Sequence, residues 1–353
     1  MLGPRSGPYI EDFRRLGASV RPLNLGSLFS TGKPFGRLRF AMRLIINTFQ
    51  IIGVMVRFSP DIVYTNTATI VAGAVASWLG RRPHVWHIHE NLRHLYENSK
   101  TLNIGFVFSL SQLRYLIESL SATVIFVTYL ARDSLYPDGV PKNAVVVHNG
   151  VRMTDLQRNG LAARLSLDRG LRPGDPRIVF VGALAQRKGV DVLLRALGAI
   201  LADYPKLQLD LWGQGKEDYI RYLRRLCSEL GISEKVNFKG FSDQIPAVLS
   251  NYSIAVMPSR AESFGLGVLE AMAAGVPVVT TRCGGPEEFI QDGMTGYVVN
   301  PEDVAELSEA MRKVLADPER ARAMAREARR KVAIDFDLES KLDDILTQLR
   351  SVA

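Results

Sequence analysis

Cysteine is scarce in this sequence of 353 residues, and its scarcity excludes several classes of protein. Only Cys227 and Cys283 occur, which is too few for a disulfide framework or for a zinc site with four thiolates. Such a chain fits a reducing compartment, so we expect it in the cytoplasm. The apolar fraction of 47% and the charged fraction of 23% are those of an ordinary globular protein, which excludes a disordered or fibrous chain.

A long uninterrupted apolar run is also missing. The longest one covers residues 41–56 and contains Arg43. Because a helix that spans a bilayer needs about 20 apolar residues, we expect no spanning segment. Basic residues flank the run, and a basic, apolar helix can lie on an anionic bilayer. The alternative, which we favour, is a helix that is buried before the next strand.

Motifs that would identify several other functions do not occur. There is no Gly-x-Gly-x-x-Gly after a predicted strand, no Walker loop and no aromatic-plus-basic RNA motif, so we expect neither a nicotinamide dehydrogenase nor a nucleic-acid partner. The segment Asp335-Phe336-Asp337 is similar to a metal-binding Asp-x-Asp, but its place just before a helix favours capping. His87 and His89 share one face of a strand without an evident third ligand, so no metal is expected.

Basic residues are unevenly distributed along the chain. Residues 1–170 contain 20 Lys and Arg against 10 Asp and Glu, whereas residues 171–353 contain 24 against 26. The net charge of +8 therefore comes from the first half. Such asymmetry indicates an anionic partner, such as a membrane surface, a phosphorylated ligand or a nucleic acid, and a solvated Arg-rich surface fits it equally well.

Short β-branched runs alternate with longer helical stretches. Each run is almost continuously apolar, which is typical of parallel strands that are buried on both faces. The repetition predicts a doubly wound α/β fold. The predicted strands of the first half are 19–25, 61–66, 84–89, 123–128 and 144–148, and those of the second half are 178–184, 207–212, 236–241, 254–258, 276–280 and 297–299.

Glycines and prolines cluster near residues 169–176, where we place a domain boundary. We therefore expect one domain over 1–170 and a second over 171–335. The last segment, 336–353, contains an amphipathic helix whose apolar stripe needs a partner surface, and we expect it to cross back to the first domain.

The densest group of candidate functional residues is Glu262-Ser263-Phe264-Gly265-Leu266-Gly267-Val268-Leu269-Glu270. It follows a predicted strand, and a helix should begin near Gly265. Two glycines there allow the backbone to approach a ligand, and the free amides of a helix N-terminus form an anion site that suits a diphosphate. Glu270, inside the helix, could accept both hydroxyls of a ribose. Taken alone, the motif equally fits a helix cap at Glu262 and a solvated Glu270.

A second loop makes the anion site more specific. Arg187 and Lys188 follow the predicted strand 178–184 and precede another helix. Cations at the carboxyl edge of a parallel sheet lie where α/β folds bind phosphorylated ligands. Since both loops belong to one domain, they can converge on one diphosphate.

With these motifs the sequence resembles the family 4 glycosyltransferases, which have the GT-B fold. The residues from Glu262 to Glu270 match the family's Glu-x7-Glu motif, and Lys188-Gly189 matches its Lys-Gly segment. Other segments that fit lie in both halves of the chain: Asp61 to Asn66, His89-Glu90, His148 to Val151, Gly213 to Gly215, Val236 to Gly240, Gly284 to Glu288 and Asp292 to Gly296. The resemblance implies two Rossmann-like domains that face a cleft.

The family implies retaining transfer of a sugar from a nucleotide-diphosphate donor, without a bound metal or other cofactor. By the resemblance, Lys188 holds the diphosphate with the amides of Leu266 and Gly267, and Glu270 binds the ribose. Catalytic roles fall on Glu262, which holds the donor sugar, and on His89, which reaches that sugar across the cleft. The remaining donor-binding residues implied are Gly182, Arg187, Ser263, Phe264 and Gly265.

Two departures from the family pattern matter. The family has a Gly-Arg pair where this chain has Gly182-Ala183, so one diphosphate cation is missing unless Arg187 replaces it. The first strand, its Gly-rich loop, the first helix and the second strand also have no counterpart before residue 8. We therefore expect an incomplete first domain with a reduced sheet, in which the segment 20–25 is displaced or isolated.

Two functions remain open at this point. The first is an active glycosyltransferase with a glycan or lipid-linked acceptor, which works in surface polysaccharide or glycolipid synthesis. It would be cytoplasmic, with a possible peripheral contact between its basic first domain and the inner face of the membrane. The second is an inactive, truncated homologue that binds nucleotide sugars. The donor base, the donor sugar and the acceptor cannot be read from these motifs.

Overall fold

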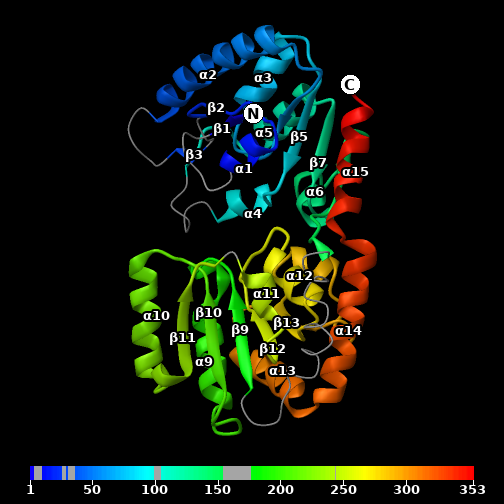
Figure 1. The fold of residues 1–353 in the computed structure, drawn as a ribbon. Helices are drawn as coiled ribbons and strands as arrows, with labels where there is room; N and C mark the ends of the chain where they lie inside the picture. The colour runs from blue at the N-terminus through cyan, green and yellow to red at the C-terminus, as the bar shows by residue number, and fades with distance from the viewer. Residues whose placement is uncertain (4–9, 26–28, 31–35, 99–104, 154–175, 243) are drawn as a thin grey trace. The chain divides into compact units, whose positions relative to one another are not determined.

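The computed structural model describes residues 1–3, 10–25, 29–30, 36–98, 105–153, 176–242 and 244–353. They form two compact units, of which one comprises Met1–Val147 with Asp344–Ala353 and the other His148–Asp343. Each unit has a parallel sheet with helices packed against it (Figure 1). Every strand range expected from the sequence overlaps an observed strand, so the predicted α/β class is confirmed. The boundary expected near 169–176 lies almost wholly outside the described residues.

The first unit contains a four-stranded parallel sheet in the order β4-β5-β7-β8. Trp86 and Ile88 of β5 are completely buried with Val124 and Phe126 of β7, as the continuous apolar runs require. The elements before the sheet are β1 (Leu2–Gly3), α1 (Ile10–Arg15), β2 (Arg21–Pro22), β3 (Phe29–Ser30) and α2 (Gly36–Phe58). Those from the sheet onward are β4 (Val63–Thr65), α3 (Ala72–Leu79), β5 (His84–Ile88), α4 (Leu92–Glu97), β6 (Gly105–Phe106), α5 (Leu110–Leu120), β7 (Thr123–Phe126), α6 (Tyr129–Leu135) and β8 (Ala144–Val146).

Strand β2 lies outside this four-stranded sheet. Arg21 and Pro22 pair in parallel with Leu2 and Gly3 of β1, and β4 pairs only with β5 among the strands described. Leucine side chains at positions 2, 23 and 25 pack against helices α2 and α3 instead. The 20–25 segment is thus displaced from the four-stranded sheet in the described part of the unit, while the loss of N-terminal strands from that sheet stays a prediction.

Helix α2 is buried along one face only. Ile51 and Met55 are buried, whereas Ile45 and Phe49 are 58% and 68% exposed. The burial that we favoured for residues 41–56 is therefore wrong for the outward face, because apolar residues occur on two opposite faces of the helix and do not reveal which of them meets the core. Of the described helices, Leu38–Phe58 is also the one that is long and apolar enough to cross a membrane by length and composition alone, so the absence of a spanning segment stays a prediction.

The second unit contains a six-stranded parallel sheet in the order β11-β10-β9-β12-β13-β14. Its elements up to β12 are β9 (Arg177–Val181), the 3-10 turn η1 (Gln186–Lys188), α9 (Val190–Ile200), β10 (Gln208–Trp212), α10 (Glu217–Glu229), η2 (Ser233–Lys235), β11 (Val236–Gly240), α11 (Ile245–Leu249) and β12 (Ile254–Met257). The later ones are α12 (Leu266–Ala273), β13 (Val278–Thr281), η3 (Gly285–Glu288), β14 (Tyr297–Val299), α13 (Val304–Ala316), α14 (Pro318–Asp335) and α15 (Leu338–Arg350).

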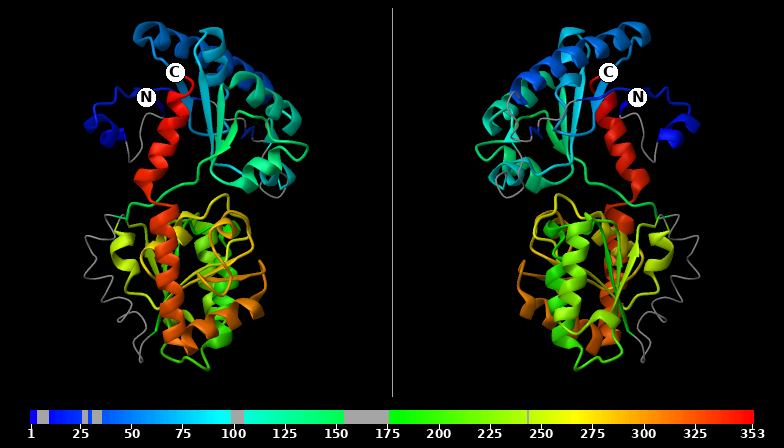
Figure 2. Two further views of the ribbon diagram at one scale, coloured as in Figure 1. Left: turned by 90° about the vertical axis from the view of Figure 1, so that its right-hand side faces the viewer. Right: turned by 90° about the vertical axis from the view of Figure 1, so that its left-hand side faces the viewer.

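Helices cover both faces of this sheet (Figure 2). Ile178 and Phe180 of β9 belong to one buried cluster with side chains of α9, α10 and α13, while the equally buried Val179 points to the opposite face. Along the chain, β9 is followed to one side by β10 and β11 and to the other side by β12 and β13. The strand order therefore reverses between β9 and β12, and such a reversal opens a crevice at the carboxyl ends of the strands.

The C-terminal helix α15 contributes to the first unit. Its residues from Asp344 onward group with that unit, and Ile345 and Leu349 pack against the buried cluster of Val85, Ile125 and Val147. Leu342 and Leu346 are each 42% exposed. The apolar stripe read from the sequence thus has a partner surface over its last two turns.

This packing predicts that Leu349→Ala lowers the free energy of unfolding by about 1–2 kcal/mol, as loss of a half-buried leucine does. Urea denaturation measures the change. Leu346→Ala removes the same atoms from the exposed side of the same helix and should cost under about 0.5 kcal/mol. Equal losses in the two variants would show that α15 is not held through Leu349.

Candidate donor-binding site

The candidate site lies where the sheet of the second unit reverses its strand order. The loop after β9 contains Arg187 and Lys188, and the loop after β12 contains Glu262. Because β9 and β12 are adjacent parallel strands, both loops emerge at the same edge of the sheet. The topology therefore brings together two motifs that are 74 residues apart in sequence.

The two loops are in backbone contact at Gly189. This residue ends η1 and begins α9 with φ 65°, a left-handed conformation that glycine adopts without strain. A Cβ atom placed there would lie 1.9 Å from the carbonyl oxygen of Pro258. Only glycine lets the β9 loop pass this close to the β12 loop, and Lys188 is positioned as a result.

An ion pair that the sequence analysis missed fixes the same two loops. Arg260, in the β12 loop, donates from Nη1 and Nη2 to the two carboxylate oxygens of Asp191 in α9, at 2.9 and 2.8 Å. It also donates to the carbonyl oxygen of Gln186, and its backbone N–H donates to Arg187. Burial alone would raise the pKa of Asp191, but the hydrogen bonds from Arg260 lower it below its ordinary value.

The sequence indicates one member of this pair, Asp191. Asp191 follows Lys188-Gly189-Val190 and lies in the first turn of a predicted helix, where a carboxylate is favourable. Nothing in the sequence around Arg260 indicates that this arginine, rather than Arg187, is the partner.

Glu262 lies at the centre of the polar contacts. Its carboxylate forms an ion pair with Lys188, lies 3.4 Å from Nη1 of Arg187 and accepts a hydrogen bond of 3.4 Å from Ser259. Both Lys188 and Glu262 are largely buried, with side chains 16% and 14% exposed. Since no described side chain caps helix α12, whose N-cap residue is Gly265, the capping role considered for Glu262 is not observed.

Glycines bring the first turn of α12 close to the surrounding loops. Gly265 has φ 98°, and a Cβ atom there would lie 2.8 Å from Pro286 and 3.5 Å from Glu262. A Cβ atom at Gly267 would lie 2.9 Å from the carbonyl oxygen of Val181, at the end of β9. The helix therefore begins directly over the two strand ends, and its first amides have no acceptor within the helix.

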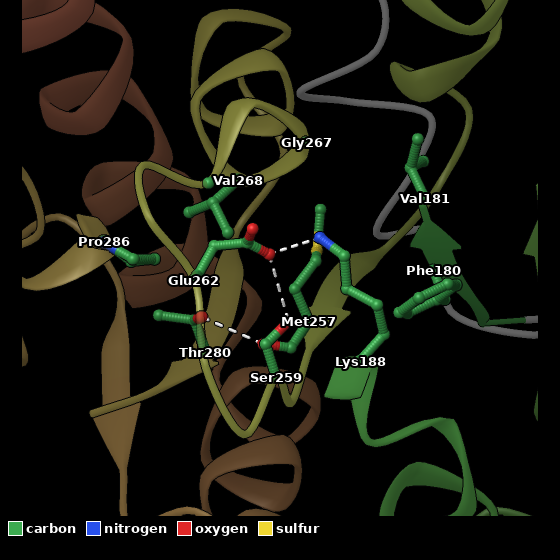
Figure 3. Close-up of a pocket in the computed structure, with 11 residues that line it drawn as sticks. Phe180, Val181, Lys188, Met257, Ser259, Glu262, Gly267, Val268, Thr280 and Pro286 are labelled. Carbon is green, nitrogen blue, oxygen red and sulfur yellow. Dashed lines mark hydrogen bonds and ion pairs between the residues drawn. The ribbon is translucent and has the colours of Figure 1, made fainter. Parts of the chain in front are cut away.

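These parts enclose a pocket of about 270 Å³, open volume included. In Figure 3 the Lys188 and Glu262 side chains point toward each other, with Ser259 and Thr280 beneath them and Gly267 above. The lining residues are Phe180, Val181, Lys188, Met257, Ser259, Glu262, Gly265, Gly267, Val268, Thr280 and Pro286. One cation, one carboxylate and a helix start thus face a single space.

Other residues predicted from the motif lie around this pocket without lining it. Gly182 lies beside the Lys188 side chain, since a Cβ atom there would be 3.8 Å from Lys188 Cε. Arg187 is half exposed, Leu266 is 45% exposed and Ser263 is partly buried. The Phe264 ring is buried against the rings of His148, Phe289 and Phe336, so only its backbone can face a ligand.

Glu270 lies further along α12 and does not line the pocket. It is not the solvated helix residue considered from the sequence, because it is partly buried and burial raises its pKa above the ordinary value. A carboxylate that is held in a poorly hydrated position, without a cation among the causes of its shift, is costly for the fold.

His89 belongs to the first unit and follows β5 directly. Its Nε2 lies 2.7 Å from the amide oxygen of Asn66, so Nε2 donates and Nδ1 remains an acceptor. Burial lowers the pKa of His89, although Glu90 acts in the opposite direction, and the imidazole is neutral at physiological pH. The ring of His87 lies 4.2 Å away, and burial lowers the pKa of His87 to about 3.

Other reactive groups do not form a metal site or a nucleophile. Among the described residues no three His, Cys, Asp or Glu side chains are grouped as metal ligands. Asp335 pairs with Lys331 at 3.0 Å and ends α14, while Asp337 forms a bridge with Val151. Burial raises the pKa of Cys283 to about 11, so this thiol is protonated at neutral pH.

The arrangement is suited to an anion that carries a polar group. Lys188 and the amides at the start of α12 can contact a diphosphate, and Glu262 can accept hydroxyl groups next to it. Positive groups placed where charge develops on a leaving diphosphate would favour its departure.

Comparison with known proteins agrees with this arrangement. A family model described as "Glycosyl transferases group 1" matches residues 166–331, and one described as "Glycosyl transferase 4-like domain" matches residues 1–150. The glycogen synthase of Mycobacterium tuberculosis is 36% identical over 197 residues, which are 55% of this chain and 45% of that protein.

A second relative, the GDP-mannose-dependent alpha-(1-6)-phosphatidylinositol monomannoside mannosyltransferase of Mycolicibacterium smegmatis, is 36% identical over 197 residues. That match covers 53% of this chain and 48% of the relative. The chain thus spans less than half the length of each of these two relatives.

Solved structures share the fold over almost the whole chain. The crystal structure of Anabaena Alr3699/HepE in complex with UDP-glucose has a TM-score of 0.78 at 23% identity and covers 99% of this chain and 91% of its own. Sucrose-phosphate synthase from Thermosynechococcus elongatus has a TM-score of 0.74 at 22% identity. The match covers 95% of this chain and 84% of the synthase chain. The predicted fold of two Rossmann-like domains is confirmed, and two glycosyltransferase family models match the first and the second part of the chain.

Proposed function

We propose that the protein is a retaining glycosyltransferase that moves a sugar from a nucleotide-diphosphate donor to a glycan or lipid-linked acceptor. The observation that carries the proposal is the contact between Lys188 and Glu262 in a pocket at the strand-order reversal, under the start of α12. The matches to two glycosyltransferase family models support the reaction class, and the Glu-x7-Glu motif supports family 4 and retention.

In this proposal each group of the pocket has one task. Lys188 and the amides of Leu266 and Gly267 hold the diphosphate and stabilise its charge as the bond to the sugar breaks. Glu262 and the backbone around Gly265 hold the sugar hydroxyls. Arg187, whose guanidinium lies 3.4 Å from Glu262, supplies the second cation that the chain lacks at Ala183.

Two further residues have a proposed role, one in each unit. Glu270 accepts hydrogen bonds from the ribose hydroxyls, which requires its ionised form. His89 is the candidate catalytic residue of the first unit, and as a neutral imidazole it can accept a hydrogen bond at Nδ1. No metal or other cofactor is needed for these roles.

We further propose the functional division of the chain into an acceptor part (1–170), a donor part (171–335) and a returning helix (336–353). The acceptor is part of surface polysaccharide or glycolipid synthesis at the cytoplasmic face of a membrane. The basic first half supports a peripheral contact with anionic lipid there.

One experiment separates this function from a protein that only binds nucleotide sugars. UDP-sugars and GDP-sugars are screened by thermal shift, and the donor that stabilises the protein most is then tested for release of nucleoside diphosphate with a lipid-extract acceptor. We expect stabilisation and acceptor-dependent release. Stabilisation without release by any donor would favour the inactive homologue, for which the missing cation at Ala183 is the relevant observation.

Lys188→Ala should weaken binding of the nucleoside diphosphate by about 1.5–3 kcal/mol, roughly 10- to 150-fold, because one charge-assisted contact is lost. Isothermal titration calorimetry measures this affinity. Lys313→Ala, which removes an exposed lysine from α13, is the matched control and should bind like the parent protein. Similar affinity of the two variants would remove Lys188 from the donor site.

Glu270→Gln should change stability and binding in opposite directions. Because burial raises the pKa of Glu270, the folded state binds the carboxyl proton more tightly than the unfolded state does. The free energy of unfolding therefore falls as pH rises from the ordinary pKa of a glutamate to the raised pKa of the folded protein. The variant should therefore melt at a higher temperature than the parent at pH 7 and at the same temperature near pH 4, in differential scanning calorimetry.

The same variant should bind a ribonucleoside diphosphate about tenfold more weakly than the parent, because a carboxylate acceptor is lost. It should bind the 2′,3′-dideoxy analogue as the parent does, since that ligand has no ribose hydroxyls to lose. An equal loss for both ligands would place Glu270 outside the ribose site.

Arg260→Lys should loosen the two loops, because lysine cannot make the bidentate contact with Asp191. We expect a loss of about 1–2 kcal/mol in the free energy of unfolding and weaker donor binding. Arg312→Lys, which changes the arginine that pairs with Asp203 at 2.8 Å elsewhere in the unit, is the control and should leave donor binding unchanged. Unchanged donor binding in Arg260→Lys would mean that the pair does not position Lys188.

A further inference from the structure

Helix α2 has two apolar faces, and only one of them meets the protein. The inward face contains Phe40, Ile51 and Met55, which are buried against α3 and neighbouring segments. At 100° per residue these positions lie within about 60° of one another around the helix. On this inward face, α2 packs as an ordinary surface helix of an α/β unit does.

The outward face contains a second apolar stripe. Its six side chains are between 52% and 76% exposed: Leu38, Met42, Ile45, Ile46, Phe49 and Val56. They lie about 100° to 180° away from the buried positions, so the stripe is opposite to the core rather than at its edge. In all views α2 lies along the outer border of its unit (Figures 1 and 2). No other part of the described chain covers these side chains.

The charged residues of helix α2 all have the same sign. Residues 13–60 contain eight Lys and Arg and no Asp or Glu. Arg39, Arg43 and Arg57 are exposed on α2, and at 100° per residue they lie together along one border of the outward face. A helix with a large apolar face and a cationic border is suited to an anionic lipid interface.

The end of the neighbouring helix α3 adds groups of the same kind. Trp78 and Leu79 are 64% and 51% exposed, and Arg81 and Arg82 follow them at the surface. A Cβ atom at Gly80 would lie 2.5 Å from Met55, so this end of α3 lies against α2. Trp and Arg are favoured where apolar and charged regions of a membrane meet.

We propose that α2 is a membrane-docking helix, which lies in the plane of an anionic bilayer with Leu38, Ile45 and Phe49 inserted among the acyl chains. A second copy of the chain is disfavoured as the occupant, because the arginines along the border of one copy would repel those of the other. A spanning orientation is disfavoured because the opposite face of α2 packs on its own unit. The inference gives the proposed membrane contact a defined surface, and it rests on the proposed function only for the identity of the acceptor.

Vesicle co-sedimentation tests the proposal without any sugar donor. The protein should bind vesicles that contain phosphatidylglycerol, should bind phosphatidylcholine vesicles at least about tenfold more weakly, and should lose binding as salt rises. Ile45→Ser with Phe49→Ser should reduce partitioning to the anionic vesicles by about tenfold or more. Arg39→Gln with Arg43→Gln should reduce it by several-fold and flatten the salt dependence.

Phe241→Ser is the matched control, because Phe241 is 69% exposed in the second unit, against 68% for Phe49. It should bind vesicles like the parent, and circular dichroism should show that all variants are folded. Unchanged binding of the Ile45/Phe49 variant would overturn the proposal. So would a dimer in analytical ultracentrifugation that this variant abolishes, since the face would then be an interface between copies.

The outcome is independent of the transferase assay. Vesicle binding without release of nucleoside diphosphate would leave α2 as a docking helix and contradict the proposed reaction. Release of nucleoside diphosphate without vesicle binding would support the reaction and contradict the docking helix.

Discussion

The bidentate ion pair between Arg260 and Asp191 is the constraint on which the candidate site depends. It joins the loop after β12 to the first turn of α9, and the close approach at Gly189 leaves no space for a side chain between these segments. Lys188 and Glu262 are next to this junction, so it fixes their positions. Two flexible loops could not hold a cation and a carboxylate at a fixed distance from each other. These two loops are fixed because they follow adjacent strands.

Much of the site could be predicted from the sequence, because close backbone contacts require glycine at particular positions. Gly189, Gly265 and Gly267 occupy positions where a Cβ atom would collide with another loop, so their pattern is tied to the fold. Lys188 and Glu262 follow strands whose apolar runs are easy to recognise. Arg260 could not be assigned in the same way, because an arginine in a loop has many possible partners and only the tertiary structure selects Asp191.

The first unit shows the limit of sequence patterns more clearly. The positions of its strands were predictable, since each buried parallel strand needs a continuous apolar run. The exposure of α2 was not predictable, because Ile45 and Ile51 are the same residue type and only the position of the sheet decides which one is buried. Periodicity identifies a core face when the opposite face is polar, and α2 lacks that contrast.

The ion pair between Lys188 and Glu262 means that the lysine in the pocket has a counter-ion within the protein itself. A free phosphate would have to displace the carboxylate from the lysine and would leave Glu262 with only its longer contacts to Arg187 and Ser259, so it would gain little. A complete donor can offer phosphate oxygens to Lys188 and hydroxyl groups to Glu262 at once, and both ends of the broken pair are then satisfied. In the proposed reaction, the pair would therefore select ligands in which an anion and a polyol are joined, and it would favour release of the diphosphate once the sugar has left.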